Sequence, residues 1–480
     1  MRILLINPPQ VYNKGERPFV VFPLGLGYIA AALQKHNYNV EIIDCIGEAS
    51  KTKTQFNKQQ YLFGLRFEQI CKRLQQTKPD LVLISCTCSL QQQVLQKIAA
   101  IVKEMNNQAK VVVGGNHASA QPKELLQNDN IDFVVLGEAE ITITKLVEAL
   151  RQGNSIHKIQ GIALRRGRKV SIKEQKNNPQ SLDRLPFPAR HLFPFECYAS
   201  ASHKHTMLRN KGKVAEILSS RGCQFNCSYC ASHVVSGRSV RTRSIDNVAG
   251  EIKYLIAKYG IKEFHFEDDN ILFDKTRFYA LCEQLSHLKI RWTVPNGLNV
   301  QQLDNEMIDN MKYSGCNTLF LAIESANKHV LKLHVDKSIN QSHVISIVNH
   351  AKHRCMYTVG FFLLGFYEES KADIMNTVNY ASKLGLDEAH FSIVSPLPGS
   401  RYYESHKKLI TNVSKLSSKN AITSTKYLAA KEVETLRNWA YILFETRKML
   451  HRPISYFDSD QISRITRYAK YLLFDILSGK

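Results

Sequence analysis

SSRGCQFNCSYCASH, residues 219–233, decides what kind of domain the second half of the chain forms. It sets three cysteines at Cys223, Cys227 and Cys230, with three residues in the first gap and two in the second. A closed zinc site needs four ligands, and a disulfide framework needs an even number of cysteines. The stretch is therefore one ligand short of the first and one partner short of the second.

Three thiolates on one short loop suit an iron–sulfur cluster better than zinc. His233 is available as a fourth zinc ligand, but the loop has no second ligand pair at zinc-finger spacing. A lone Cys-x-x-Cys pair would favour thioredoxin-like exchange, in which Cys223 has no role. Thiolates hold iron–sulfur clusters, and three of them can bind three irons of a 4Fe–4S cube and leave the fourth iron open to a substrate.

Size and composition indicate a globular protein of more than one domain. The chain has 480 residues, 44% of them hydrophobic and 22% charged. MRILLINPPQ at the N-terminus has the pattern of a buried strand and not of a signal peptide, and no apolar run approaches the length of a membrane span. The eleven cysteines are odd in number and scattered, which argues against disulfides. We expect a soluble, cytoplasmic protein without a transmembrane segment.

The formal net charge of +22 permits two interpretations. Such a charge suits a nucleic acid or an anionic membrane as partner. The basic residues are nevertheless spread along the chain, and their longest clusters, RRGRK at 165–169 and RSVRTR at 238–243, are short. General lysine enrichment and anionic cofactors explain the charge more simply, so nucleic acid is not the expected partner.

A regular alternation of strands and helices follows residue 213. Apolar runs predict six strands, at 216–220, 263–268, 290–296, 318–325, 358–366 and 389–399. Helical patterns such as residues 244–260 and 304–315 separate them. Six βα units in succession predict a partial (βα)6 TIM-like barrel over residues 213–404, with active-site groups on the loops after the strands. The three cysteines lie on the first such loop.

The first 150 residues alternate in the same way. Strands are predicted at 2–9, 39–44, 80–86, 110–115 and 132–138, with helices at 26–36, 67–76, 90–105 and 143–153. The pattern predicts a doubly wound, Rossmann-like α/β domain over residues 1–150, whose ligand binds beyond the carboxyl ends of the strands. Those ends read NPPQ, SCTCS, GGNHAS and GEAE, and their small and polar residues favour a ligand crevice.

Two further regions complete the chain. Residues 151–212 look like a connector, with a hairpin pattern at 160–172 and a proline-punctuated linker at 182–194. Residues 405–480 are predicted to be a helical C-terminal region. Its apolar face favours packing on the barrel, and binding to a membrane surface is the alternative.

The cysteine spacing carries a family resemblance. Cys-x3-Cys-x2-Cys after the first strand of a partial barrel, with Tyr229 just before the last cysteine, resembles the radical S-adenosylmethionine (SAM) superfamily. The resemblance implies that Cys223, Cys227 and Cys230 hold a 4Fe–4S cluster whose open iron binds SAM. In that family an electron from the cluster cleaves SAM to a 5′-deoxyadenosyl radical, which abstracts hydrogen from unactivated carbon.

The resemblance also places SAM contacts at the strand ends of the barrel. FEDDN (266–270) stands where the family binds the methionine amino group, and LAIES (321–325) resembles a ribose or carboxylate contact. VGFFLLGFYEES (359–370) matches the fifth-strand pattern, whose glycines let the backbone approach adenosine. The implied SAM-binding residues are Tyr229, Glu267, Asp268, Glu324, Ser325, Gly360 and Gly365. Where relatives read Gly-x-Pro-Gly-Glu, residues 365–369 read GFYEE, which leaves the position of Glu369 open.

The N-terminal half is similar to the subfamily that carries a cobalamin-binding Rossmann-like domain, the class B-type radical SAM methyltransferases. INPP, PLGLGYIAAAL, the strand ending in SCT, GGNHAS, GEAE and LPFPAR carry the match. The implied cobalamin contacts are small residues and strand-end backbone, namely Ser85, Thr87, Gly114, Gly115, Gly137 and Glu138. The Asp-x-His-x-x-Gly signature is absent, which implies cobalamin with its own base displaced and no protein imidazole on cobalt. His117 is accordingly expected to be a rim residue.

Three reactions stay open on this basis. The first is methylation of an unactivated carbon in a small molecule or natural-product intermediate, with an external electron donor such as flavodoxin or ferredoxin. The second is a radical cyclisation, oxidation or rearrangement without net methyl transfer. The third, tRNA methylthiolation, is disfavoured because Cys86 and Cys88 form the only close cysteine pair in the N-terminal domain. A cofactor-binding protein without turnover is the non-enzyme alternative, and the sequence identifies no catalytic residue beyond the cofactor contacts.

Overall fold

The chain forms two compact units. The computed structural model describes residues 1–14, 16, 18–167, 169–175, 181–201, 212–337, 339–410, 416, 417 and 419–451. The first unit comprises Met1–Gln224 with Ala231–Asp269, and the second comprises Phe225–Cys230 with Asn270–Lys480. The boundary between the units crosses the loop that carries the three cysteines, called the cysteine loop below. Cys223 lies in the first unit, and Cys227 and Cys230 lie in the second.

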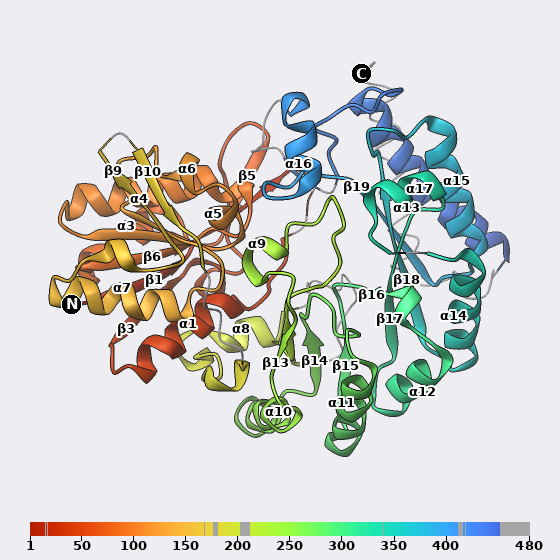
Figure 1. The fold of residues 1–480 in the computed structure, drawn as a ribbon, viewed down its shortest axis with the longest axis horizontal. Helices are drawn as coiled ribbons and strands as arrows, with labels where there is room; N and C mark the ends of the chain where they lie inside the picture. The colour runs from red at the N-terminus through yellow and green to blue at the C-terminus, as the bar shows by residue number, and fades with distance from the viewer. Residues whose placement is uncertain are drawn as a thin grey trace. The chain divides into compact units, whose positions relative to one another are not determined.

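A seven-stranded sheet is the centre of the first unit (Figure 1). In spatial order its strands are β10 (Lys169–Lys173), β9 (Ile162–Arg166), β8 (Phe133–Val135), β7 (Lys110–Gly114), β6 (Leu81–Ser85), β1 (Ile3–Asn7) and β3 (Val40–Asp44). The strands from β8 to β3 are parallel, and β9 and β10 extend the sheet as the predicted hairpin. Counted along the chain, the parallel strands lie in the order 2-1-3-4-5, which confirms the doubly wound prediction.

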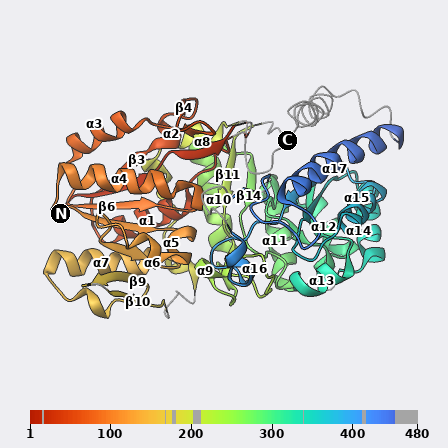
Figure 2. The same cartoon turned by 90° about the horizontal axis from the view of Figure 1, so that it is seen from above.

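Helices cover both faces of this sheet. The four longest are α1 (Leu24–Lys35), α3 (Phe67–Thr77), α4 (Gln92–Met105) and α7 (Glu140–Gln152). Helix α1 packs against α7, and α3 packs against α4. The chain moves from β1 outward to β3 and then back past β1 to β6, so right-handed crossovers place α1 and α3 on opposite faces (Figure 2). The strand order thus changes direction between β1 and β6, and ligands of such sheets usually bind beyond the carboxyl ends of the strands at this point.

A small antiparallel sheet was not predicted from the sequence. It pairs β2 (Gln10–Asn13) with β5 (Gln60–Phe63), and β5 with β4 (Lys53–Gln55). Tyr12 and Tyr61 are directly paired, and their rings stack with centroids 6.0 Å apart. The strands are three or four residues long and β4 is wholly polar, so no window of apolar alternation marks them.

The first unit also holds the beginning of the second βα series. Strand β11 (Val214–Ile217) is parallel to β14 (Glu263–Phe266), and α10 (Ile245–Tyr259) connects them. A short hairpin of β12 (Ser220–Arg221) and β13 (Arg241–Thr242) follows β11 and leads into the cysteine loop. All six strands predicted after residue 213 are present, and each unit contains some of them.

In the second unit a parallel sheet continues the series. It contains β16 (Leu298–Asn299), β17 (Thr318–Glu324), β18 (Tyr357–Leu364) and β19 (Glu388–Ile393), and β15 (Arg291–Thr293) precedes it. Helices α14 (Gln341–His353) and α15 (Lys371–Lys383) pack on β18, and α17 (Ala430–His451) packs on β19 and α15 (Figure 1). This confirms the predicted packing of the C-terminal region as far as His451. Residues 462–477 of this region, on which the alternative of binding to a membrane surface depends, lie outside the described residues.

Within the described ranges, every helix is too short or too polar to cross a lipid bilayer.

Candidate active site

The first part of the cysteine loop is fixed by two consecutive aspartates. The carboxylate of Asp268 accepts hydrogen bonds from the backbone N–H and hydroxyl of Ser219, at 2.9 and 2.7 Å, and from the hydroxyl of Ser220 at 2.5 Å. Asp269 accepts the N–H of Gly222 at 3.3 Å. A Cβ on Gly222 would lie 2.4 Å from the carbonyl oxygen of Ser239, and its φ of +98° is left-handed, so only glycine fits before Cys223.

The second part of the loop is fixed by the helix α13 (Lys328–His334) and the residues after it. The N–H of Asn226 donates to Asp336 at 2.8 Å, and Arg401 donates to the carbonyl of Asn226. Cys227 is buried against Leu331 and Val335, with Phe225, Tyr229, Cys230 and Ile339 packed around them. Burial in this apolar setting raises the pKa of the Cys227 thiol.

The donor set of this loop fits an iron–sulfur cluster. All eleven cysteines lie within the described residues and are free thiols, so Cys223, Cys227 and Cys230 are not consumed by disulfides. Among the described residues, no three His, Cys, Asp or Glu side chains gather closely enough to hold a single metal ion. The thiolates of a 4Fe–4S cluster each bind a different iron, so they need not converge on one point as the ligands of a zinc ion do.

Glu324, at the end of β17, is directed toward the cysteine loop within the second unit. Its φ of +68° is unusual for a residue with a side chain, and the strand register shifts between Ala322 and Glu324. The carboxylate pairs with Lys337 at 3.2 Å. Burial raises the pKa of Tyr229 well above its usual value, and the nearby Glu324 acts in the same direction. The structure therefore brings together two predicted SAM-binding residues, Tyr229 and Glu324, on the strand-end side of the sheet.

The other predicted SAM contacts have partners inside the protein. Ser325 is buried with its hydroxyl 3.1 Å from that of Thr377. A Cβ on Gly360 would lie 2.5 Å from a methyl group of Leu386 and 2.9 Å from the ring of Phe362, so a larger residue would require these side chains to shift. Gly365 has a φ of +85° and donates its N–H to Glu369 at 2.7 Å. Glu267 lies directly after β14 and donates its own N–H to the carbonyl of Ile217 at 2.9 Å. Their contact with SAM stays a prediction.

The predicted cobalamin contacts lie at the carboxyl ends of neighbouring strands. Ser85 and Gly114 end β6 and β7 and are direct partners in the strand register. The nearest atom to a Cβ on Gly114 is 3.8 Å away, so the fold itself leaves room for a methyl group there. A Cβ on Gly115 would instead lie 2.6 Å from the carbonyl oxygen of Cys86. Thr87 is exposed, and its N–H and its hydroxyl both donate to the side-chain oxygen of Gln91 at 3.1 Å.

Two glutamates after β8 belong to a buried ion-pair network of the first unit. Glu138 is held in a bidentate contact by Arg241 and is 3.2 Å from Arg221. Arg221 also donates to Glu140 at 2.8 Å. The loop after β8 is thus joined to Arg221, which lies two residues before Cys223. The carboxylate of Glu138 is committed to arginine, and the contact of its backbone with cobalamin stays a prediction.

His117 is not a rim residue but a buried residue at the start of the short helix α5 (Asn116–Ala120). Its Nδ1 lies 3.0 Å from the hydroxyl of Ser89, and its Nε2 lies 3.2 Å from the side-chain oxygen of Gln92. Both ring nitrogens are engaged inside the protein.

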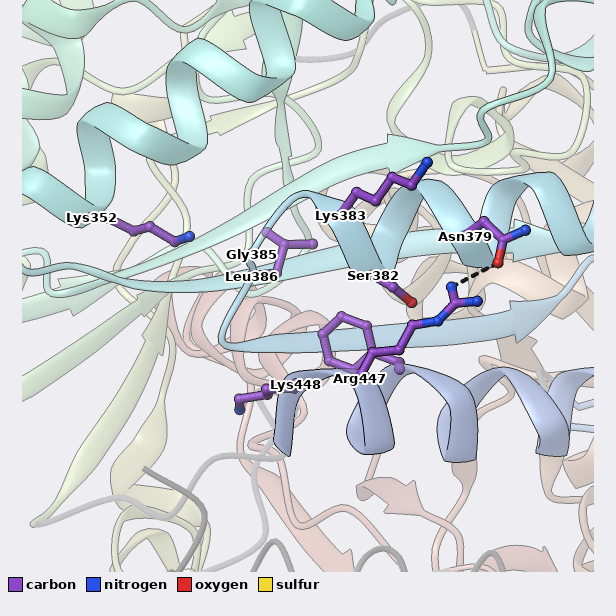
Figure 3. Close-up of a pocket in the computed structure, with 9 residues that line it drawn as sticks. Lys352, Asn379, Ser382, Lys383, Gly385, Leu386, Arg447 and Lys448 are labelled. Atoms are coloured by element: carbon purple, nitrogen blue, oxygen red, sulfur yellow. Dashed lines mark hydrogen bonds between the residues drawn. The ribbon is translucent and has the colours of Figure 1, made fainter. Parts of the chain in front are cut away.

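A cavity of about 730 Å³ lies at the other end of the second unit's sheet, between α14, α15 and α17 (Figure 3). Its lining includes Lys352, Lys383, Arg447 and Lys448, and Arg447 donates to Asn379 at 2.7 Å. Gly385 and Leu386 in its wall precede β19, whereas active-site groups of βα barrels follow the strands. Lys352 and Lys383 stand in the last turns of α14 and α15, where they offset the partial negative charge of the helix C-termini.

Sequence comparison decides the family. Residues 13–147 match the family model of the B12 binding domain, and residues 217–381 match that of the Radical SAM superfamily. A cytidylyl-2-hydroxyethylphosphonate methyltransferase of Streptomyces wedmorensis is 31% identical over 428 residues, which are 83% of this chain and 80% of that protein. The chain belongs to the cobalamin-binding radical SAM family. An uncharacterized methyltransferase of Pyrococcus horikoshii, PH0819, is 30% identical to this radical SAM protein and covers 93% of both chains.

Solved structures agree in fold. The radical SAM methyltransferase TsrM of Kitasatospora setae, with cobalamin and a [4Fe-4S] cluster bound, gives a TM-score of 0.66 at 18% identity, over 85% of this chain and 75% of that one. The cobalamin-dependent radical enzyme OxsB, with aqua-cobalamin and SAM bound, gives 0.72 at 14% identity, over 98% and 70%. The protein is thus a radical SAM enzyme whose cofactors are cobalamin, a 4Fe–4S cluster and SAM.

Several residues that shape the site were missed from the sequence. Arg221, Lys337 and His334 all contact the cysteine loop or a predicted ligand residue. Arg221 was within reach of sequence reasoning, because it flanks Cys223 and a buried acidic pair, Glu138 and Glu140, needs cations. Lys337 and His334 lie more than a hundred residues from the cysteines, and nothing local in the sequence marks them.

Proposed function

We propose that this enzyme methylates an unactivated carbon of a small molecule, taking the methyl group from SAM. The observation that carries the proposal is the pairing, in one chain of this family, of a loop with three free thiols and a doubly wound sheet with small residues at its strand ends. When bound, cobalamin supplies methyl transfer and the cluster supplies the reductive cleavage of SAM. The phosphonate methyltransferase that is 31% identical to this chain supports a small-molecule substrate.

The chain's own residues would bind and orient these groups. Cys223, Cys227 and Cys230 would hold the cluster, and the apolar surroundings of Cys227 would keep water from it. Tyr229 and Glu324 would border the SAM site, with Lys337 holding the carboxylate of Glu324 in place. The backbone at Ser85 and Gly114 would lie against the corrinoid. Asp268 would act through Ser219 and Ser220, by fixing the segment that leads to Cys223.

Two relatives favour a second reaction of the same class. Anaerobic magnesium-protoporphyrin IX monomethyl ester cyclases of Synechocystis and Cereibacter sphaeroides are 24% and 23% identical to this chain. A cyclase-type reaction would consume SAM only through the radical, without transfer of its methyl group. The products of SAM therefore separate the two proposals, since methyl transfer yields S-adenosylhomocysteine and radical cleavage yields 5′-deoxyadenosine.

The test uses the full chain, reconstituted anaerobically with iron, sulfide and hydroxocobalamin. It is incubated with SAM that carries a deuterated methyl group and a low-potential reductant, and both nucleoside products are measured. Methyl transfer predicts both products, and 5′-deoxyadenosine alone would overturn it in favour of the cyclase-type reaction. A Cys227→Ala variant is the matched control and should yield no 5′-deoxyadenosine.

We also propose that the enzyme works in the cytoplasm and takes its electron from a flavodoxin or ferredoxin. Eleven free thiols support a reducing compartment. The net charge of +22 supports an acidic electron-transfer partner, since opposite charges steer association.

A further inference from the structure

Ser228, which lies between two cluster ligands, is held by one histidine. Its hydroxyl is 2.9 Å from Nδ1 of His334, and its N–H donates to the carbonyl of His334 at 2.8 Å. The carbonyl of Ser228 accepts the N–H of Tyr402 at 2.8 Å. Ser228 and His334 are both buried. Ser228 therefore has its hydroxyl and its N–H committed to His334 and its carbonyl committed to Tyr402.

His334 reaches a carboxylate with its other nitrogen. Its Nε2 lies 2.7 Å from Oε2 of Glu368. The tautomer that satisfies both contacts has its hydrogen on Nε2, which donates to the carboxylate, and leaves Nδ1 to accept the hydroxyl hydrogen of Ser228. The ring also stacks on Phe366, with centroids 4.5 Å apart and planes 13° from parallel. The orientation of the imidazole is thus fixed from three sides.

Glu368 and Phe366 come from the loop after β18, whose residues 365–369 read GFYEE. Glu369 closes the turn of this loop, because it accepts the N–H groups of Gly365 and Phe366 at 2.7 and 3.0 Å. The neighbouring Glu368 is thereby left to reach His334. One glutamate of the loop thus holds the turn and the other makes the contact with the histidine.

We propose that His334 and Glu368 are positioning residues, which hold the segment between Cys227 and Cys230, through Ser228, at a fixed place against the loop after β18. The inference rests on the proposed function, in which the cysteine segment binds the cluster and the loop after β18 approaches the adenosine of SAM. Neither residue takes part in electron or methyl transfer. Their effect is on how well SAM meets the open iron.

The test measures SAM binding through the cluster and not through turnover. Wild type, His334→Ala, His334→Gln, Glu368→Ala and Glu368→Gln are reconstituted anaerobically, and iron and sulfide per chain are determined. The electron paramagnetic resonance spectrum of the reduced cluster is then followed while SAM is added. We expect His334→Ala and Glu368→Ala to raise the SAM concentration for half of the spectral change roughly tenfold, the effect of losing a charge-assisted hydrogen bond. The two glutamine variants keep a hydrogen-bonding amide and should stay within about twofold to threefold of wild type.

A matched control exists in the same unit. His350 makes an equivalent contact with Asp309, Nε2 to Oδ1 at 2.7 Å, on α14 outside the sheet. His350→Ala should leave the SAM titration unchanged, which separates the inference from a general effect of removing a histidine–carboxylate pair.

The outcomes decide between the possibilities. A full iron content with an unchanged SAM titration in His334→Ala overturns the inference. If His334→Ala binds no cluster, Glu368→Ala decides instead, because it leaves Ser228 and His334 in place, and an unchanged titration there overturns it equally. A wild-type cluster whose spectrum ignores SAM contradicts the proposed function itself, whatever the variants do.

Discussion

Arg221 donates a hydrogen bond to Glu140 at 2.8 Å, and both side chains are buried in the first unit. Removal of one partner from a buried ion pair leaves an uncompensated charge, which costs about 3–5 kcal/mol. We therefore expect Arg221→Ala to lower the free energy of unfolding of this unit by about that amount. Faster hydrogen exchange in α7, which begins at Glu140, would report it.

Two internal controls accompany this prediction. Arg151→Ala removes an exposed pair with Glu148, which water screens, and should leave the stability nearly unchanged. Both tryptophans, Trp292 and Trp439, lie in the second unit, so their fluorescence should change little in Arg221→Ala. An Arg221→Ala protein whose α7 exchanges as slowly as wild type would show that the network contributes little.

The cysteine assignment predicts which thiols are needed for iron. We expect Cys223→Ala, Cys227→Ala and Cys230→Ala each to lose most of the roughly four irons per chain that a 4Fe–4S cluster brings. Cys88→Ala should keep them, because Cys88 lies in the first unit's α/β domain, and there an auxiliary cluster would be needed only for tRNA methylthiolation. The iron and sulfide content and the visible absorbance after anaerobic reconstitution measure the cluster in all four variants. Loss of iron in Cys88→Ala would support tRNA methylthiolation instead.

The sequence predicts best the elements whose side chains are buried on both faces. Strands such as Leu81–Ser85 and Lys110–Gly114 are nearly continuous apolar runs, and their alternation with helices is enough to infer a parallel sheet. The cysteine spacing was equally informative, because ligand spacing is a local property. The β2–β5–β4 sheet was missed, since its stability comes from tertiary contacts such as the Tyr12–Tyr61 stack.

The roles of individual site residues depend on contacts that sequence order does not show. Asp268 was expected at SAM, but its carboxylate binds Ser219 and Ser220, almost fifty residues earlier. The backbone of Glu138 was expected at cobalamin, and the arginines that its side chain binds, Arg221 and Arg241, come from the second βα series. In both cases the residue was correctly placed at a strand end. The group that each side chain faces depends on how distant segments pack together, and the local sequence pattern does not show this packing.

Two adjacent glycines separate a ligand contact from a folding requirement. Gly114 has room for a methyl group, so Gly114→Ala should fold normally. If the corrinoid lies against it, overpacking by about 1–3 kcal/mol should weaken cobalamin binding roughly 5- to 150-fold. Gly115→Ala should destabilise the protein with or without cobalamin, because its Cβ would meet the carbonyl oxygen of Cys86 at 2.6 Å.

Cobalamin retained after gel filtration, together with the melting temperature of the apoprotein, measures both effects. Gly250→Ala in α10 is the matched control, since its Cβ would make an ordinary 3.6 Å contact with Phe187. Normal cobalamin retention in Gly114→Ala would remove Gly114 from the corrinoid contacts.

Glu369 makes stability depend on pH in a direction opposite to that of most carboxylates. Its side chain is buried, and desolvation raises its pKa from 4.5 to about 7, although the N–H groups of Phe366 and Gly365 oppose the shift. Between these two values the folded protein keeps the proton and the unfolded chain releases it. Stability from this group is therefore present below pH 4.5 and falls as the pH rises to about 7, by about 1.4 kcal/mol per pH unit.

Glu369→Gln removes this titration while its amide oxygen can still accept both N–H groups. We expect the variant to gain stability relative to wild type as the pH rises from 5 to about 7, with no further gain above that range. Urea unfolding followed by tryptophan fluorescence at several pH values measures the difference. Glu432 also accepts a backbone N–H, from Ala429 at 2.8 Å, but is exposed, so Glu432→Gln should leave the profile unchanged. A constant difference between Glu369→Gln and wild type across this range would mean that Glu369 is already ionised in the folded protein.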